Sequence, residues 1–157
     1  MTTTVKMDPN TYPANCMVGT FWHPNEDERN LAAKHLDKVM QEVDKPLRPY
    51  LVRLFFSPLI VPIYSCWGHF KEPNQINNDG YILFRSFLDP TDLLQKIIVP
   101  LQKSTAKELG YFTPEFETST WHTVGLDKMG YIIRWHQVLE EDKKEFLLEK
   151  FCELCGV

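Results

Sequence analysis

The side chains best suited to chemistry gather in residues 120–136, a segment that one Trp-His pair opens and a second Trp-His pair closes. His122, Arg134 and His136 are its reactive members. An imidazole can give or take a proton near neutral pH, and a guanidinium can hold an anion or stabilise developing negative charge. We therefore take His122, His136 and Arg134 as the candidate catalytic residues.

The turn of a β-hairpin decides whether these three side chains meet. Asp127 and Gly130 suit a three-residue loop that a left-handed glycine closes. In that register His122 faces His136, and Arg134 shares their side of the hairpin. A four-residue loop would disperse the cluster, because a shift of one residue turns every side chain to the other face. Turn chemistry favours the first register.

Three uses of such a cluster are consistent with its residue types. The two imidazoles and a third ligand could bind a transition metal, although the charge of Arg134 opposes a second cation there. One histidine could act as a general acid–base while Arg134 holds an anionic substrate or developing enolate. The groups could instead form a solvated strand face, with Arg134 paired to Glu115 or Glu117.

The chain lacks the motifs of the common cofactor and hydrolase classes. It contains no glycine-rich phosphate loop, no Gly-x-Ser-x-Gly elbow and no His-Glu-x-x-His. No cofactor and no metal ligand set are therefore assigned. Cys152 and Cys155 form a lone Cys-x-x-Cys in the last turn of an expected helix, which is only half a zinc site. We expect them to be packing cysteines.

Aromatic side chains supply candidate walls for a pocket, since they make up 13% of the chain and large rings line most small-molecule sites. Two of the tryptophans flank the hairpin histidines and could equally belong to the core. The candidate ligand-binding residues are the four tryptophans, Trp22, Trp67, Trp121 and Trp135.

The composition is that of one soluble domain. At 157 residues the chain can bury a large core, and its 43% hydrophobic residues are ordinary for a globular protein. The net charge is −4 with no run of basic residues, so nucleic acid is not an expected partner. The apolar run at residues 51–64 is too short to cross a membrane, and the N-terminus lacks the pattern of a secretory signal. We expect a cytoplasmic protein without a membrane partner.

Turn formers, helix caps and apolar periodicity predict an α+β fold with a mostly antiparallel sheet. Residues 1–13 are expected to form a loose arm, and residues 14–157 a single domain that a turn-rich loop divides near its middle. The expected parts of this domain are two βαββ-like halves and a C-terminal helix, residues 14–71, 80–137 and 140–155.

Each half is expected to run strand, helix, strand, strand. In the second half, Asp89 and Pro90 mark the start of the helix, Pro100 a kink and Gly110 its end. The hairpin strands follow that helix. The remaining elements are expected at residues 14–23, 26–43, 50–56 and 60–70 in the first half, and at 80–88 and 90–109 in the second.

The leading hypothesis for function is a small-molecule-binding domain with an aromatic-lined pocket for a small organic, anionic ligand. As an enzyme it would be a cofactor-independent isomerase, cyclase or dehydratase, with His122 or His136 as the acid–base group. The alternative hypothesis is a non-enzymatic interaction subunit or adaptor, acting as a homodimer or with a protein partner. Exposed aromatic residues at 55–67 would then form the contact patch.

Overall fold

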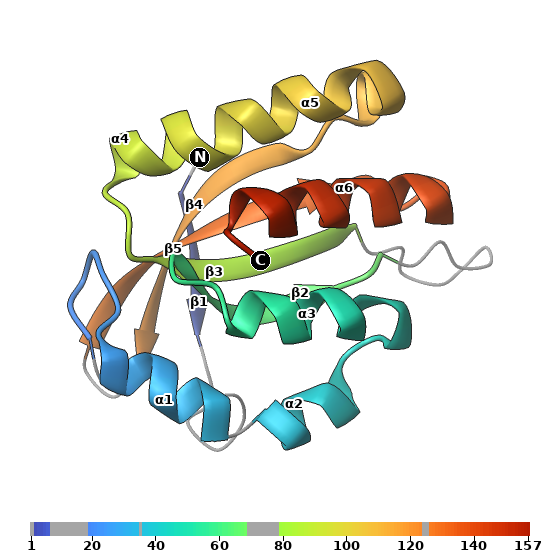
Figure 1. Cartoon of the computed structure of the whole chain (residues 1–157). Helices are drawn as coiled ribbons and strands as arrows, with labels where there is room; N and C mark the ends of the chain where they lie inside the picture. The colour runs from blue at the N-terminus through green and yellow to red at the C-terminus, as the bar shows by residue number, and fades with distance from the viewer. Residues whose placement is uncertain (1, 7–18, 35, 69–78, 124–125) are drawn as a thin grey trace.

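Five strands form one sheet, and six α-helices accompany it in the part of the chain that the structure describes (Figure 1). The computed structural model describes residues 2–6, 19–34, 36–68, 79–123 and 126–157, with the backbone alone at residues 2–6, 31, 39, 121–123 and 126. The strands are β1 (Thr2–Lys6), β2 (Ile60–Cys66), β3 (Gly80–Ser86), β4 (Glu115–Thr123) and β5 (Leu126–Trp135). The helices are α1 (Glu26–Lys34), α2 (Leu36–Glu42), α3 (Arg48–Phe55), α4 (Pro90–Leu93), α5 (Val99–Leu109) and α6 (Glu141–Leu154).

The strands follow the order β1-β4-β5-β3-β2 across the sheet. Neighbouring strands run antiparallel, except that β1 lies parallel to β4. The predicted α+β class with a mostly antiparallel sheet is therefore confirmed. The strand–helix–strand–strand order occurs twice along the chain, once from β1 to β3 and once from β3 to β5, so that the two repeats share β3.

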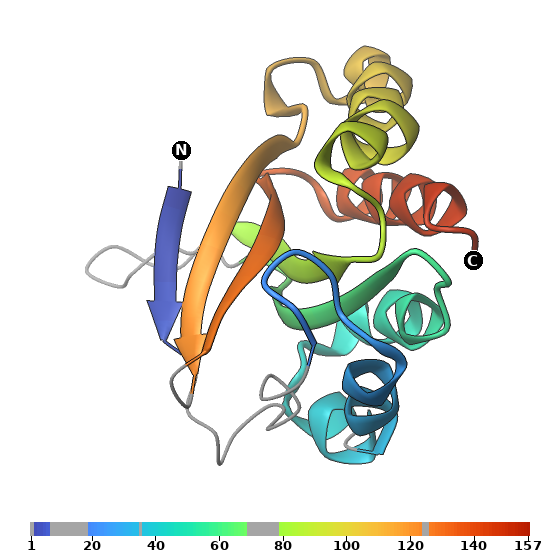
Figure 2. The same ribbon diagram turned by 90° about the vertical axis from the view of Figure 1, so that its left-hand side faces the viewer.

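The sheet buries side chains on both faces, with the larger core on the side of α3, α5 and α6 (Figure 2). In β3, Ile82 and Phe84 belong to this core, whereas Leu83 between them belongs to a second cluster with Ala32 of α1. The Phe84 ring lies 5.6 Å from the ring of Phe151 on α6, centroid to centroid. Opposite faces of one strand thus serve two cores, as the two-residue period of a strand requires.

The predicted strand at residues 50–56 is wrong, because this segment lies in helix α3. Its buried side chains, Leu51, Leu54 and Phe55, follow the spacing of one helix face. A proline in the first turn is harmless to the helix, since the N–H it lacks would have no helical partner. A short apolar run cannot be assigned to helix or strand from periodicity alone.

None of the described helices combines the length and apolarity that a membrane crossing needs.

The predicted helix at residues 90–109 is present as α4, a π-helical turn at Leu94–Ile98 and α5, which follow one another without a break. The wide turn comes just before Pro100, the site of the expected kink. A proline has no N–H and crowds the carbonyl one turn earlier, and a wider turn relieves both effects. Gly110 ends α5 with a φ of 55°, which confirms the predicted stop. The predicted C-terminal helix is α6.

The N-terminal part departs most from the prediction. Residues 2–6, expected in a loose arm, form β1 beside β4. Of the strand predicted at residues 14–23, residues 19–23 form a turn, and residues 14–18 lie outside the described part of the chain. The helix predicted at residues 26–43 is present as α1 and α2.

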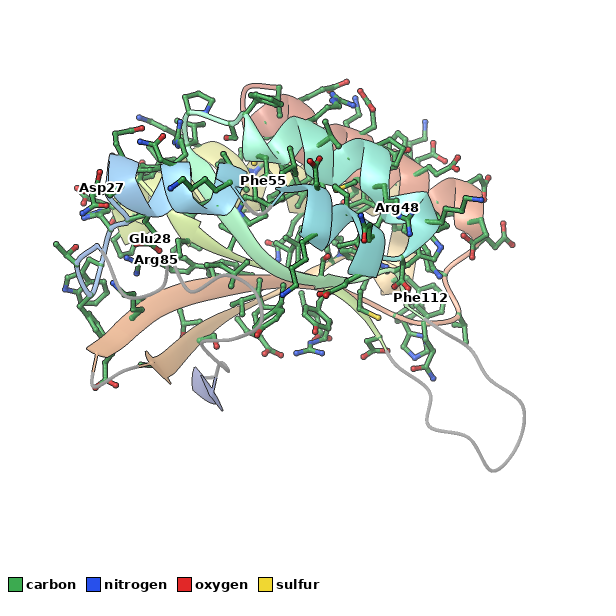
Figure 3. The ribbon with its side chains drawn as sticks, turned by 90° about the horizontal axis from the view of Figure 1, so that it is seen from below. Asp27, Glu28, Arg48, Phe55, Arg85 and Phe112 are labelled. Carbon is green, nitrogen blue, oxygen red and sulfur yellow. The ribbon has the colours of Figure 1, made fainter. Side chains whose placement is uncertain are left out.

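A buried ion pair fastens the turn before α1 to the sheet. Arg85 of β3 and Glu28 of α1 are both fully buried, with Arg85 Nε 2.8 Å from Glu28 Oε1 (Figure 3). Arg85 also donates to the carbonyl of Thr20 at 2.6 Å, and to those of Phe21 and Met129 at 2.9 Å. A buried cation is tolerated only when its donors are satisfied in this way.

Gly19 completes this attachment by having no side chain. A Cβ at Gly19 would lie 2.0 Å from Oε2 of Glu28, and the φ of 91° is one that other residues rarely adopt. The carbonyl of Gly19 accepts a hydrogen bond from Nζ of the buried Lys128 at 2.8 Å. Arg85 and Lys128 thus hold the turn through its backbone carbonyls, while the Phe21 and Trp22 side chains are exposed.

We expect Arg85→Met to lower the free energy of unfolding by about 3–5 kcal/mol, because the substitution leaves a buried carboxylate without its cation. Urea denaturation followed by circular dichroism measures this loss. Lys143→Met, which breaks the partly exposed pair with Glu108, is the control and should hardly move the midpoint. Equal losses in the two variants would contradict the burial of the Arg85–Glu28 pair.

The loss in Arg85→Met should also depend on pH. Burial raises the pKa of Glu28, and the hydrogen bond from Arg85 works against this rise. Without Arg85 the protonated carboxyl is favoured still more in the folded state. Between the pKa of Glu28 in the unfolded chain and its higher pKa in the folded variant, the folded variant binds more protons than the unfolded chain. The free energy of unfolding of the variant therefore increases as pH falls through this range. The deficit relative to the wild-type chain should be smaller at pH 5 than at pH 7.5.

Candidate functional site

The register of the β4–β5 hairpin places His122 and His136 at opposite ends. His122 pairs with Asp127 at the start of β5, whereas His136 follows the last residue of that strand. The chain reverses between Thr123 and Leu126, and the predicted three-residue loop is part of β5. Both hairpin registers considered from the sequence are therefore wrong, and the expected pairing of the two histidines does not occur.

A cavity of about 130 Å³ lies at the end of the sheet where β5 stops. Trp135 pairs with Gly80 at the start of β3, and Arg134 with Glu115 at the start of β4. Antiparallel pairing thus gathers one strand end and two strand starts at the same edge. Arg134 and His136, two of the three candidate catalytic residues, both belong to this His136 cavity. Its lining residues are Asp79, Tyr111, Phe112, Thr113, Glu115, Arg134, Trp135 and His136.

The imidazole of His136 has a defined orientation. Its Nδ1 accepts a hydrogen bond from the N–H of Val138 at 3.2 Å, and its ring lies 5.3 Å from that of Phe112, centroid to centroid. Because Nδ1 is an acceptor, the neutral ring carries its proton on Nε2, which can donate to a ligand. Asp79 is oriented by the adjoining backbone, since its Oδ1 accepts from the N–H of Gln137 at 3.2 Å.

Arg134 already has a carboxylate partner. Its Nε lies 3.4 Å from Oε1 of Glu117, and its Nη2 lies 3.4 Å from Oε2. The two residues lie on neighbouring strands, so this is the cross-strand pairing that one sequence interpretation predicted. An incoming anion would have to compete with Glu117 for the guanidinium, which weakens the case for Arg134 as an anion anchor.

Among the tryptophan side chains that the structure describes, Trp135 is the one that lines the His136 cavity. It is 1% exposed, and its indole N–H donates to the carbonyl of Trp67 at 2.9 Å. Trp67 is buried behind it. Gly80 permits this packing, because a Cβ there would lie 1.8 Å from Nε1 of Trp135. Trp22 is 48% exposed on the turn before α1, and Trp121 is described by its backbone alone.

Sequence reasoning missed the members of the cavity that come from loops and strand starts. Asp79 precedes β3, Tyr111 and Phe112 follow α5, and Glu115 begins β4. Their sequence positions show nothing unusual. They meet only because β3 and β4 both pair with β5, so the register had to be known before these residues could be assigned to one site.

Cys152 and Cys155 are packed in the core, as the sequence predicts, and both are fully buried. Burial raises the pKa of Cys152 to about 12 and that of Cys155 well above its ordinary value. Thiols of this kind are poor nucleophiles and poor metal ligands, because both roles need the thiolate. Within the described residues, no three His, Cys, Asp or Glu side chains converge as a metal site requires.

Comparisons with protein-family models, with curated proteins and with solved structures find no match to this chain. A fold class alone does not determine function. We therefore infer function from the geometry and charge of the sites themselves.

We expect iodoacetamide to label Cys66 in the folded protein well before Cys152 and Cys155. Cys66 is partly exposed, and burial raises the pKa of its thiol, as does the nearby Asp44 carboxylate. Labelling of Cys66 should be slow at neutral pH and accelerate as pH rises, because the thiolate reacts. Mass spectrometry of timed samples measures each rate, with a urea-unfolded sample as control. Equal native rates at the three cysteines would contradict the packing of α6.

Proposed function

We propose that this chain is a binding domain for a small organic molecule and that the His136 cavity is its site. The observation that carries the proposal is the convergence of aromatic and ionisable side chains from three segments in one hollow. Small-molecule sites combine apolar walls with a few polar groups that orient the ligand. The volume of about 130 Å³ is near that of an engineered cavity of roughly 150 Å³ that binds benzene. A single ring or a short chain therefore fits.

The charges around the cavity favour a cationic ligand over the anionic one expected from the sequence. Asp79 and Glu115 add two carboxylates to the lining, and Glu117 already neutralises Arg134. Carboxylates beside aromatic rings suit an ammonium group, through charge-assisted hydrogen bonds and cation–π contact. Nε2 of His136 can donate to an acceptor on the same ligand. A protonated aralkylamine, that is, an aromatic ring with an ammonium group on a short alkyl chain, is therefore the ligand class that we propose.

An enzymatic role would rest on His136. The register places His122 at the other end of the hairpin, so of the two histidines considered as the acid–base group only His136 lies at the cavity. With Asp79 and Glu115 in the same lining, His136 could still move a proton on a bound amine. Cofactor-independent isomerase or lyase chemistry of this kind is an extension of the binding proposal, and binding does not depend on it.

Nuclear magnetic resonance titration of the full chain with benzylamine tests the binding proposal. We expect shifts in the indole N–H signal of Trp135 and in the backbone amides of residues 136–138, because His136 lines the cavity and the N–H groups of Gln137 and Val138 bond to the lining residues Asp79 and His136. Benzoate, of similar size and opposite charge, should cause no comparable shifts, because two carboxylates repel it. Shifts of equal size with benzoate would contradict the assigned ligand charge.

Charge-removing variants make the same test sharper. Asp79→Asn and Glu115→Gln should each weaken benzylamine binding by about three- to tenfold, the loss of one charged hydrogen bond at a partly exposed site. Glu153→Gln removes one negative charge from the far end of α6 and is the matched control. Unchanged affinity in both cavity variants would exclude the carboxylates as ligand contacts.

A second candidate function, docking of a protein partner, is favoured by the turn before α1. Phe21 and Trp22 are 37% and 48% exposed, and their rings meet edge to face with centroids 5.0 Å apart. The turn is held in place because Arg85 bonds its carbonyls. Exposed Trp on an ordered backbone is typical of an interface hot spot. In the predicted patch at residues 55–67, Phe56 is exposed, whereas Phe55 and Trp67 are buried.

Capture experiments with the immobilised wild-type chain and its Phe56→Ala and Trp22→Ala variants test this second function. A true partner should bind the wild-type chain and Phe56→Ala, whose side chain is 72% exposed elsewhere. The same partner should bind Trp22→Ala at least tenfold more weakly, as loss of a hot spot requires. Quantitative mass spectrometry measures the captured amounts. Identical capture by all three proteins would count against the turn as an interface.

A further inference from the structure

An irregularity in the edge strand β2 opens a second cavity. The pairing of β2 with β3 shifts between Pro62 and Tyr64, which makes Ile63 the extra residue of a β-bulge. In a regular strand alternate residues face opposite ways, yet residues 62–65 all line this cavity. The proline is tolerated because β2 lies at the edge of the sheet. Bulges often re-aim side chains beside functional sites.

This β2 cavity lies between the bulge, the end of α2 and helix α3, where Phe55 is labelled in Figure 3. Its volume is about 160 Å³. It shares no lining residue with the His136 cavity, so binding at one cavity does not require binding at the other.

The deep wall of the β2 cavity is apolar. Leu51 and Phe55 lie one turn apart on α3 and face Ile63, and all three side chains are at most 8% exposed. Native interiors contain few voids larger than a water molecule. An engineered cavity of roughly 150 Å³ with such walls binds benzene. The β2 cavity therefore has the size and the lining for one aromatic ring.

The polar members of the lining are its more exposed ones, with Glu42 at the surface and Ser65 half-buried. A ring packed against Leu51 and Phe55 would thus present its polar group to Glu42 and Ser65. A hydroxyl suits both, because it can donate to the carboxylate and exchange a hydrogen bond with the serine. An anion would be repelled by Glu42. We propose that the β2 cavity binds a single-ring alcohol of the phenol type.

Phenol added to the full chain at millimolar concentration tests this proposal. We expect nuclear Overhauser effects between its ring protons and the methyl groups of Leu51 and Ile63, together with a saturable rise in Tm. Leu51→Phe fills the cavity and should weaken phenol binding at least tenfold. Leu94→Phe makes the same change at a position that is 39% exposed on the π-helical turn, and should bind phenol as the wild-type chain does.

Ser65→Ala provides a second test of phenol binding, which applies even if Leu51→Phe does not fold. It removes the hydroxyl with little change in volume, and it should reduce the preference for phenol over benzene by about fivefold, the effect of one hydrogen bond. Absence of the Leu51 and Ile63 contacts overturns the proposal, and so does an unchanged phenol-to-benzene preference in Ser65→Ala. The benzylamine titration reports on residues 136–138 and is scored separately, so failure at one cavity is distinguishable from failure at the other.

Discussion

The register of β5 is the constraint on which the rest of the structure depends. β5 is the middle strand of the five, and it pairs with β3 on one side and β4 on the other. Its residues Tyr131, Ile133 and Trp135 all enter the larger core. A slip of one position would turn these rings and methyl groups outward and carry Arg134 into the core. The same register of β5 brings the starts of β3 and β4 to the end of β5, and the His136 cavity forms where these three ends meet.

The buried Arg85–Glu28 pair has a different role, which is to attach the turn before α1 to the sheet. The turn before α1 leaves Phe21 and Trp22 exposed rather than packed in the core, so apolar burial alone holds it weakly. Arg85 replaces that missing burial with hydrogen bonds to the backbone and an ion pair to α1. Figure 3 shows Arg85 and Glu28 at the opposite end of the molecule from Phe112, which lines the His136 cavity. The attachment and the site can therefore be altered independently.

Local chemistry predicted the elements that carry their own start and stop signals, and failed where tertiary packing decides. The helix after Asp89 and Pro90, which Gly110 ends, could be predicted from those residues. Residues 50–56 could not, because a short apolar run fits a strand or a helix until its partners are known. The hairpin register was missed for a related reason. The turn chemistry of residues 127–130 indicated a loop there, but the observed register pairs every residue of the nine-residue strand β4, and that longer ladder outweighs one local turn preference. Of the three candidate catalytic residues, Arg134 and His136 line one cavity and His122 lies at the other end of the hairpin.

Both cavities arise where regular strand pairing stops, one at the end of β5 and the other at the bulge of β2, and we propose different ligands for them because their linings differ. Transfer of a charged group from water is costly unless it meets opposite charge and hydrogen-bond partners. The His136 cavity offers both through Asp79 and Glu115, next to the exposed ring of Tyr111. The β2 cavity has one carboxylate at its outer side and apolar side chains deeper inside. An ammonium group placed there would lose its hydration without gaining an opposite charge or hydrogen bonds in exchange. A neutral ring loses little hydration there and gains contact with Leu51 and Phe55. The cost of desolvation is thus the physical reason for proposing an amine at the first cavity and an uncharged phenol at the second, without any coupling between them.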